Sequence, residues 1–262
     1  MKRIYRHILG LLLLAACAAV WVFSSGLARK ELRTRTCQGK GKLQVTVTDS
    51  LERRFVARAD VQEWLDKEYG AYAGLPLDSV DLTRIEKLIS LHSAVRDCEA
   101  WITDDGILHV EISQRQPVIR LEDGQNACYA DETGYLFPLQ SRGSVNVPVV
   151  SGKIPFPLEK GFKGYLQQAD DALWLQRVIG LVTYMKGTVW EKDIRKVLVR
   201  GNGELVLYPV QGKEEFLFGP PVRVEEKFKL LTAYYRSVAP SKEPGYYSKV
   251  DLRYRKQLVC KK

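Results

Sequence analysis

An uninterrupted apolar stretch at residues 8–28 constrains this chain more than any other feature. It runs for 21 residues without a charged side chain, and as an α-helix it would be about 31 Å long, close to the hydrocarbon thickness of a bilayer. Lys2, Arg3 and Arg6 precede it with no acidic neighbour, which favours a cytoplasmic N-terminus. The sequence therefore predicts one membrane-spanning helix, with the remaining domains on the far side of the membrane.

Two other interpretations of this stretch stay open. A cleaved signal peptide usually has a shorter apolar core, of roughly 7–15 residues. A lipoprotein signal would use the small residues that come just before Cys17. The apolar run continues past Cys17 to Phe23, and Trp21 stands where an interfacial aromatic side chain is expected. We therefore favour the uncleaved anchor.

The composition after this stretch is that of a folded protein and not of a disordered one. The net charge of +9 could attract an acidic partner or anionic lipid, but nucleic acid is not expected beyond the membrane. Cysteines outside the anchor would meet an oxidising compartment. Four of them allow three complete disulfide pairings, and buried free thiols are equally open; they are Cys37, Cys98, Cys128 and Cys260.

No residue pattern supports catalysis, a metal or a cofactor. The three histidines lack the spacing of a metal site, and there is no nucleophile-elbow motif. Two carboxylate pairs could suggest hydrolysis. However, Asp104-Asp105 precedes a turn glycine, and Asp170-Asp171 lies near a predicted helix start, where acids favour the helix dipole. We expect a protein that is not an enzyme.

Hydrophobic periodicity divides the chain after the anchor. Residues 29–42 are basic and polar, as in a linker. Residues 43–116 then predict a strand, two helices and two strands, joined at the end by an Asp105-Gly106 hairpin. Asp81 is the expected N-cap of the second helix. Two helices on one face of a three-stranded sheet would bury these apolar faces.

Residues 117–262 are richer in strands. Helices are expected at 169–185 and 225–235. Strands are expected at 118–121, 127–130, 135–137, 147–150 as an edge, 194–200, 204–208, 215–218, 247–254 and 257–261. The predicted fold class is therefore α+β, with a mainly antiparallel β-domain and flanking helices after the first unit.

Three sequence runs, in this order and spacing, resemble the bacterial cell-division family FtsQ/DivIB. Glu111–Val118 is similar to the family's junction between its two domains, although Gln114 stands where glutamate is frequent. Tyr129–Pro138 is similar to its "D-x-x-G-x-x-F" turn, and Val250–Tyr254 matches its "V-D-L-R-Y" strand. The resemblance covers essentially the whole chain.

The resemblance implies a POTRA domain at 43–116 and an FtsQ-type β-domain at 117–262. It further implies a non-catalytic divisome scaffold of the cell inner membrane, with a cytoplasmic N-terminus and periplasmic domains. Such a protein would bind FtsB-like and FtsL-like single-pass proteins. In the family, the FtsB-like partner adds a β-strand to the exposed sheet edge at the last strands of the β-domain. Its role would be to help control septal peptidoglycan synthesis during septation.

Alternation in the penultimate predicted strand points to the same surface. Val250 and Leu252 would hold the strand on the domain, and the opposite face would present charges beside an open backbone edge. The predicted partner-binding residues are Tyr247, Lys249, Asp251, Arg253 and Tyr254. Alternatively, the charges only protect the edge from aggregation. Two other functions remain open, an anchored envelope hydrolase and a POTRA-type chaperone module.

Overall fold

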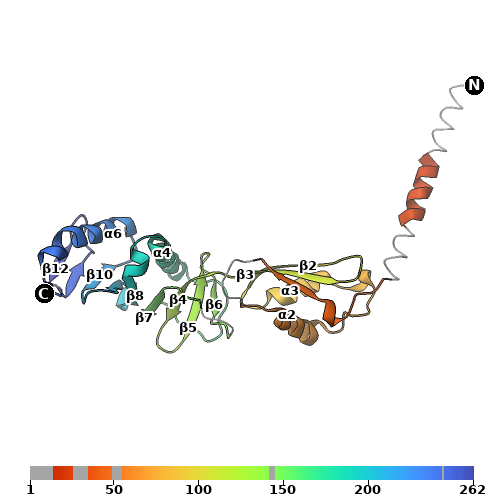
Figure 1. Cartoon of the computed structure of the whole chain (residues 1–262), viewed down its shortest axis with the longest axis horizontal. Coiled ribbons are helices and arrows are strands. Elements are labelled where there is room, and N and C mark those ends of the chain that lie inside the picture. The colour runs from red at the N-terminus through yellow and green to blue at the C-terminus, as the bar shows by residue number, and fades with distance from the viewer. Residues whose placement is uncertain (1–13, 26–34, 49–54, 142–144, 244) are drawn as a thin grey trace, which may run out of the picture. The chain divides into compact units, whose positions relative to one another are not determined.

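The computed structural model describes residues 14–25, 35–48, 55–141, 145–243 and 245–262 (Figure 1). The chain forms two compact units, which we describe separately. Of the described residues, the first contains those up to position 48 and those at 56–114, and the second contains Phe55 and those from Arg115 to Lys262.

The predicted anchor falls only partly on the described residues. Residues 14–25 are helical and largely exposed, whereas 8–13 and 26–28 lie outside the described ranges. Within those ranges, no helix combines the length and the apolar character that crossing a bilayer would require.

The first unit has the predicted order of strand, helix, helix, strand, strand. Its elements are β1 (Gln44–Val47), α2 (Arg58–Trp64), α3 (Leu82–Ser90), β2 (Val95–Ile102) and β3 (Leu108–Gln114), with η2 (Leu65–Tyr69) continuing α2 and short turns at η1 (Lys40–Lys42) and η3 (Leu77–Ser79). The described sheet has the order β1-β3-β2. Strand β3 pairs in parallel with β1 and antiparallel with β2.

Local chemistry explains the boundaries of these elements. The Asp81 carboxylate caps α3 by accepting the Arg84 N–H at 2.9 Å, and Ile85 and Ile89 bury the apolar face of the helix. Gly106 takes the positive φ of 83° that the β2–β3 turn needs. The Gln114 side chain is completely buried, and its Oε1 accepts the Val56 N–H at 2.8 Å.

Part of the expected linker belongs to the first unit. Cys37 is buried, and its N–H donates to the Leu75 carbonyl at 2.8 Å. The Gln38 N–H donates to the Gly106 carbonyl at 2.7 Å. These bonds place residues 36–38 against the β2–β3 turn and the segment before α3. All five cysteines of the chain are free thiols, so neither unit is cross-linked.

The second unit is built on one sheet with the described order β12-β11-β10-β9-β8-β7-β4-β5-β6. Its strands are β4 (Pro117–Glu122), β5 (Ala127–Asp131), β6 (Leu136–Pro138), β7 (Val149–Gly152), β8 (Ile194–Val199), β9 (Leu205–Pro209), β10 (Glu215–Gly219), β11 (Lys249–Asp251) and β12 (Val259–Lys261). Most neighbouring strands are antiparallel, as predicted. The parallel pairs are β4–β7, β7–β8 and β10–β11.

The position predicted for one strand in the sheet is wrong. The run at 147–150 was expected at an edge, but β7 lies between β4 and β8 and is parallel to both. Val150 is completely buried. Pro148 is compatible with this position because it precedes the strand, which begins at Val149.

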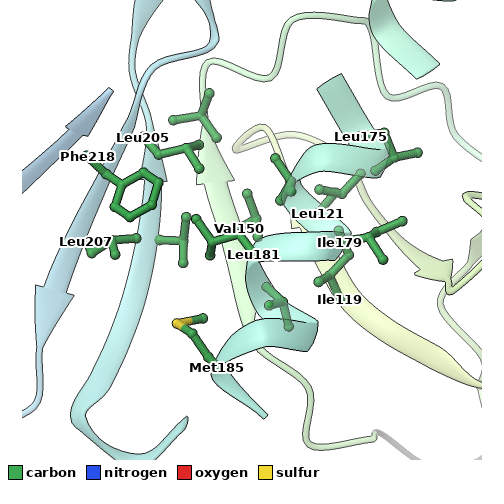
Figure 2. Close-up of a cluster of buried hydrophobic side chains, with 14 of the residues drawn as sticks. Ile119, Leu121, Val150, Leu175, Ile179, Leu181, Met185, Leu205, Leu207 and Phe218 are labelled. Atoms are coloured by element: carbon green, nitrogen blue, oxygen red, sulfur yellow. The ribbon is translucent and has the colours of Figure 1, made fainter. Parts of the chain in front are cut away.

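Helices α4 (Ala169–Met185) and α6 (Val224–Ala233) cover one face of this sheet (Figure 1). Shorter helical segments are α5 (Trp190–Asp193), η4 (Gly201–Gly203), η5 (Tyr234–Val238) and η6 (Ala239–Ser241). Figure 2 shows Leu175, Ile179 and Met185 of α4 beside strand residues of the buried cluster. Burying each large apolar side chain contributes about 1.5–3 kcal/mol, so this layer provides much of the unit's stability.

Helix α6 is also held to the sheet by a buried lysine. The Lys227 Nζ donates to the carbonyls of Phe218 at 2.6 Å and Pro220 at 2.8 Å, and it lies 4.3 Å from the centre of the Phe218 ring. The residue is only 1% exposed. Burial, with a smaller effect from the charge of Arg223, lowers the pKa of Lys227 to about 8.

This lowered pKa predicts a pH-dependent difference between the wild type and Lys227→Met. Between about pH 8 and pH 10 the unfolded chain keeps a proton on Lys227 that the folded chain has lost, so the lysine's contribution to stability rises with pH. The free energy of unfolding of the wild type, minus that of the variant, should rise by on the order of 3 kcal/mol. Urea unfolding of both proteins across this pH range measures the difference. Parallel pH profiles of the two proteins would contradict a lowered pKa for Lys227.

Candidate functional site

The described sheet ends at β12, and this end differs from the other one. At the opposite end, the outer side of β6 is already used, because Leu136 and Gly164 exchange two backbone hydrogen bonds of 2.9 Å. Strand β12 pairs antiparallel with β11, and the described residues provide no strand on its other side. The backbone edge of β12 is therefore the surface to which another strand could be added.

The predicted edge at 247–254 is wrong in its position. Only Lys249–Asp251 is a strand, and β11 lies between β10, its parallel neighbour, and β12. The sequence shows two strand-like runs near the end of the chain, but it does not show which of them is the outer one. The last run returns alongside β11 and takes the edge position.

Strand pairing indicates which groups of β12 point outward. The Leu252 N–H donates to the Leu217 carbonyl, so the backbone just after β11 faces β10. The Ser248 N–H donates to the Lys261 carbonyl at 2.8 Å, so the Lys261 carbonyl faces β11. Lys249 and Asp251 then face β12, where they pair with Lys261 and Val259. Because backbone groups alternate along a strand, the N–H and C=O of Cys260 point away from β11, toward the open edge.

Asp251 is buried, which corrects the expectation that it lies on an outer charged face. Its side chain is 1% exposed and binds the Arg253 guanidinium through two bonds, Nε–Oδ1 at 2.9 Å and Nη2–Oδ2 at 2.7 Å. The Arg253 N–H also donates to Oδ1. The hydrogen bonds from Arg253 lower the pKa of the Asp251 carboxyl group, and this pairing raises the pKa of Arg253. The alternation of apolar and polar residues predicted an exposed Asp251. That prediction is wrong because a nearby arginine neutralises the carboxylate and lets it face the interior.

The other predicted residues lie on different surfaces. Lys249 is exposed in β11. Tyr247 is half-buried and packs against the core before that strand. Tyr254 is 47% exposed in the turn between β11 and β12. The structure therefore gathers these side chains around the last two strands, but not on one strand face.

Helix α6 fixes this turn through residues that the sequence analysis did not single out. Arg223 donates to the Arg253 carbonyl at 2.7 Å, and the Glu226 carboxylate accepts the Lys256 N–H at 3.0 Å. Arg223 and Glu226 are also paired with each other at 3.3 Å. Arg223 has a positive φ of 53°, which is uncommon for a residue other than glycine. No local sequence signal connects these residues to a turn 30 positions later.

In the described ranges, no three His, Cys, Asp or Glu side chains gather as a metal site would require. The chemistry at the β12 end is that of backbone donors and acceptors, exposed aromatic surface and one internally paired carboxylate. Such a surface suits recognition of a peptide chain.

Replacing Arg253 by alanine should destabilise the second unit, because it leaves the Asp251 carboxylate buried without its counter-charge. Arg253 is itself 40% exposed, so we expect a loss of about 2 kcal/mol at pH 7, below the full cost of breaking a buried pair. The loss should shrink below about pH 4, as falling pH protonates the carboxylate whose pKa Arg253 lowers. Denaturant unfolding measures both effects.

Arg255→Ala is the matched control, since Arg255 is an exposed arginine of the same turn. Its free energy of unfolding should stay within about 0.5 kcal/mol of the wild type. Equal stability of Arg253→Ala and Arg255→Ala would show that the buried pair does not stabilise the turn.

Comparison with known proteins agrees with this architecture. The family model described as FtsQ/DivIB, C-terminal related, matches residues 116–261. The model of a POTRA-like domain matches residues 36–113, which correspond to the first unit. No curated protein matches the chain. The matches and the two-unit architecture together show that this chain is a member of the FtsQ/DivIB family of cell-division proteins.

Proposed function

We propose that this chain is a non-catalytic divisome scaffold that binds an FtsB-like single-pass protein by β-strand addition at β12. The observation that carries the proposal is the open backbone edge of β12. Membership of the FtsQ/DivIB family supports a role in cell division. An FtsL-like protein would join the same assembly, and the assembly would help to control septal peptidoglycan synthesis.

The size and chemistry of the edge suit one partner strand. Strand β12 spans only Val259–Lys261, and short, charged edges resist non-specific pairing between copies of a protein. Backbone hydrogen bonds would supply the binding energy of an added strand. Tyr254 and Lys249 are exposed beside the edge and could contact the partner's side chains.

We further propose that residues 8–28 anchor the protein in the cell inner membrane, with both folded units in the periplasm. The apolar length of the stretch and the basic residues before it support this topology. The anchor would bring the β12 edge to the single-pass partners. Fusing a reporter that is active only in the periplasm to the C-terminus tests the orientation.

A proline at position 260 tests strand addition directly. Cys260→Pro removes the outward N–H of β12 and leaves the bonds of Val259 and Lys261 toward β11 in place. Recovery of the FtsB-like protein in co-purification should fall about tenfold or more, because one backbone hydrogen bond is lost and the ring blocks close approach. Cys260→Ala, which keeps the N–H, should bind like the wild type. If a folded Cys260→Pro protein recovers the partner normally, β12 is not the docking strand.

Tyr254→Ala tests the side-chain part of the interface. Because Tyr254 is 47% exposed, its removal should change the free energy of unfolding by no more than about 0.5 kcal/mol. Partner recovery should nevertheless fall several-fold, since exposed tyrosines often anchor interfaces. Leu173→Ala on α4 removes a comparably exposed apolar side chain, 48% exposed, and should have no effect. Unchanged recovery by Tyr254→Ala would remove this residue from the interface.

A further inference from the structure

A pocket of about 230 Å³ lies at the C-terminal end of the second unit, beside the segment that leads into β11. Its walls come from three places in the sequence: the turn before β10, η5, and the segment from η6 to β11. The side chains that the argument uses are Glu214, Tyr234, Tyr235, Tyr246 and Tyr247. Four tyrosines and the Glu214 carboxylate thus line the same pocket.

Glu214 has an unused acceptor. The residue is 8% exposed, and its Oε1 accepts the hydroxyl of Tyr234 at 3.2 Å. Its Oε2 is shielded from solvent and has no hydrogen-bond partner among the described residues. Gly212 lies directly against this oxygen, and a Cβ at that position would collide with it. A buried carboxylate oxygen without a donor is costly, so a donor that enters the pocket would be strongly favoured.

The four tyrosines that line the pocket form two edge-to-face pairs. The rings of Tyr234 and Tyr235 meet at 77° with centres 5.4 Å apart, and those of Tyr246 and Tyr247 meet at 89° with centres 4.9 Å apart. Burial and the charge of Glu214 raise the pKa of Tyr234, and the same two causes raise the pKa of Tyr235 to about 12. Tyr234 and Tyr235 therefore remain uncharged at neutral pH, and their rings can face a cation.

Two exposed lysines lie near the ring of Tyr246. Lys242 lines the pocket and lies 5.4 Å from the centre of the Tyr246 ring, and Lys262 lies 4.4 Å from the same centre. Glu243 adds a second carboxylate to the lining. Neither lysine forms an ion pair with Glu214 in the described structure.

We propose that this pocket binds a primary alkylammonium group. The aromatic walls and the carboxylate favour an organic cation over a neutral ligand. The single unused oxygen needs one N–H donor, which a quaternary ammonium group lacks. The two donors of a guanidinium group would need both carboxylate oxygens, and Oε1 of Glu214 already accepts the Tyr234 hydroxyl.

This inference does not depend on strand addition at β12. A lysine side chain carried by another protein and a free amine share the same ammonium chemistry. They can be separated with two probes, n-butylamine and an acetylated, amidated Gly-Lys-Gly peptide. Equal affinities would indicate that the ammonium group alone is recognised, and tighter peptide binding would identify a protein-borne lysine as the ligand.

Ligand-observed NMR on the purified full chain, at constant ionic strength, tests the proposal. n-Butylamine should bind at least about tenfold more tightly than n-butanol, tetramethylammonium or methylguanidinium. Glu214→Gln should weaken n-butylamine binding about tenfold or more, whereas the rim variant Glu243→Gln should change it less than about threefold. Tyr246→Leu, at a 39% exposed position that tolerates substitution, should weaken it several-fold.

Three results would overturn the proposal. The first is equal binding of n-butanol and n-butylamine, and the second is unchanged n-butylamine affinity in folded Glu214→Gln or, where that variant does not fold, in Tyr246→Leu. The third is a tenfold gain in affinity on Lys242→Met, which would show that the chain's own lysine occupies the pocket.

Discussion

The buried carboxylate of Asp251, paired with Arg253, is the interaction on which the C-terminal end of the sheet depends. It lies where β11 ends, and both side-chain oxygens are bound by the residue two positions later. The carbonyl of that same arginine accepts a hydrogen bond from Arg223 at the start of α6. The chain is thereby turned at a fixed place and returns as β12, so a local ion pair sets the position of the sheet's open edge.

The rest of the second unit determines where the described sheet keeps an open backbone edge. Helices α4 and α6 cover one face of the sheet, and the contact between Leu136 and Gly164 occupies the edge at the opposite end. Within the described residues, β12 is then the end of the sheet at which backbone groups remain available. The proposed strand addition would therefore use a three-residue segment, with an exposed tyrosine in the turn before it and exposed lysines beside it.

Much of this fold follows from sequence periodicity and turn chemistry. The helix at 169–185 is confirmed at its predicted bounds, and Asp81 caps α3 as its residue type indicates. These features depend on neighbours within a few positions. The order of the strands depends instead on residues that are distant in the sequence. Strand β7 is central because β4 and β8 pair with its two sides. The outer position of β12, the burial of Asp251 and the pocket around Glu214 likewise depend on tertiary contacts that no local pattern specifies.

Amide hydrogen exchange on the full chain, with and without the FtsB-like protein, tests the central claim most directly. If β12 is the docking strand, the outward amide of Cys260 should exchange rapidly in the free protein and slowly in the complex, because the partner's backbone would accept its hydrogen bond. The amides of Val259 and Lys261, which face β11, should change less. Protection confined to another surface, with Cys260 still exchanging rapidly in a saturated complex, would contradict the account.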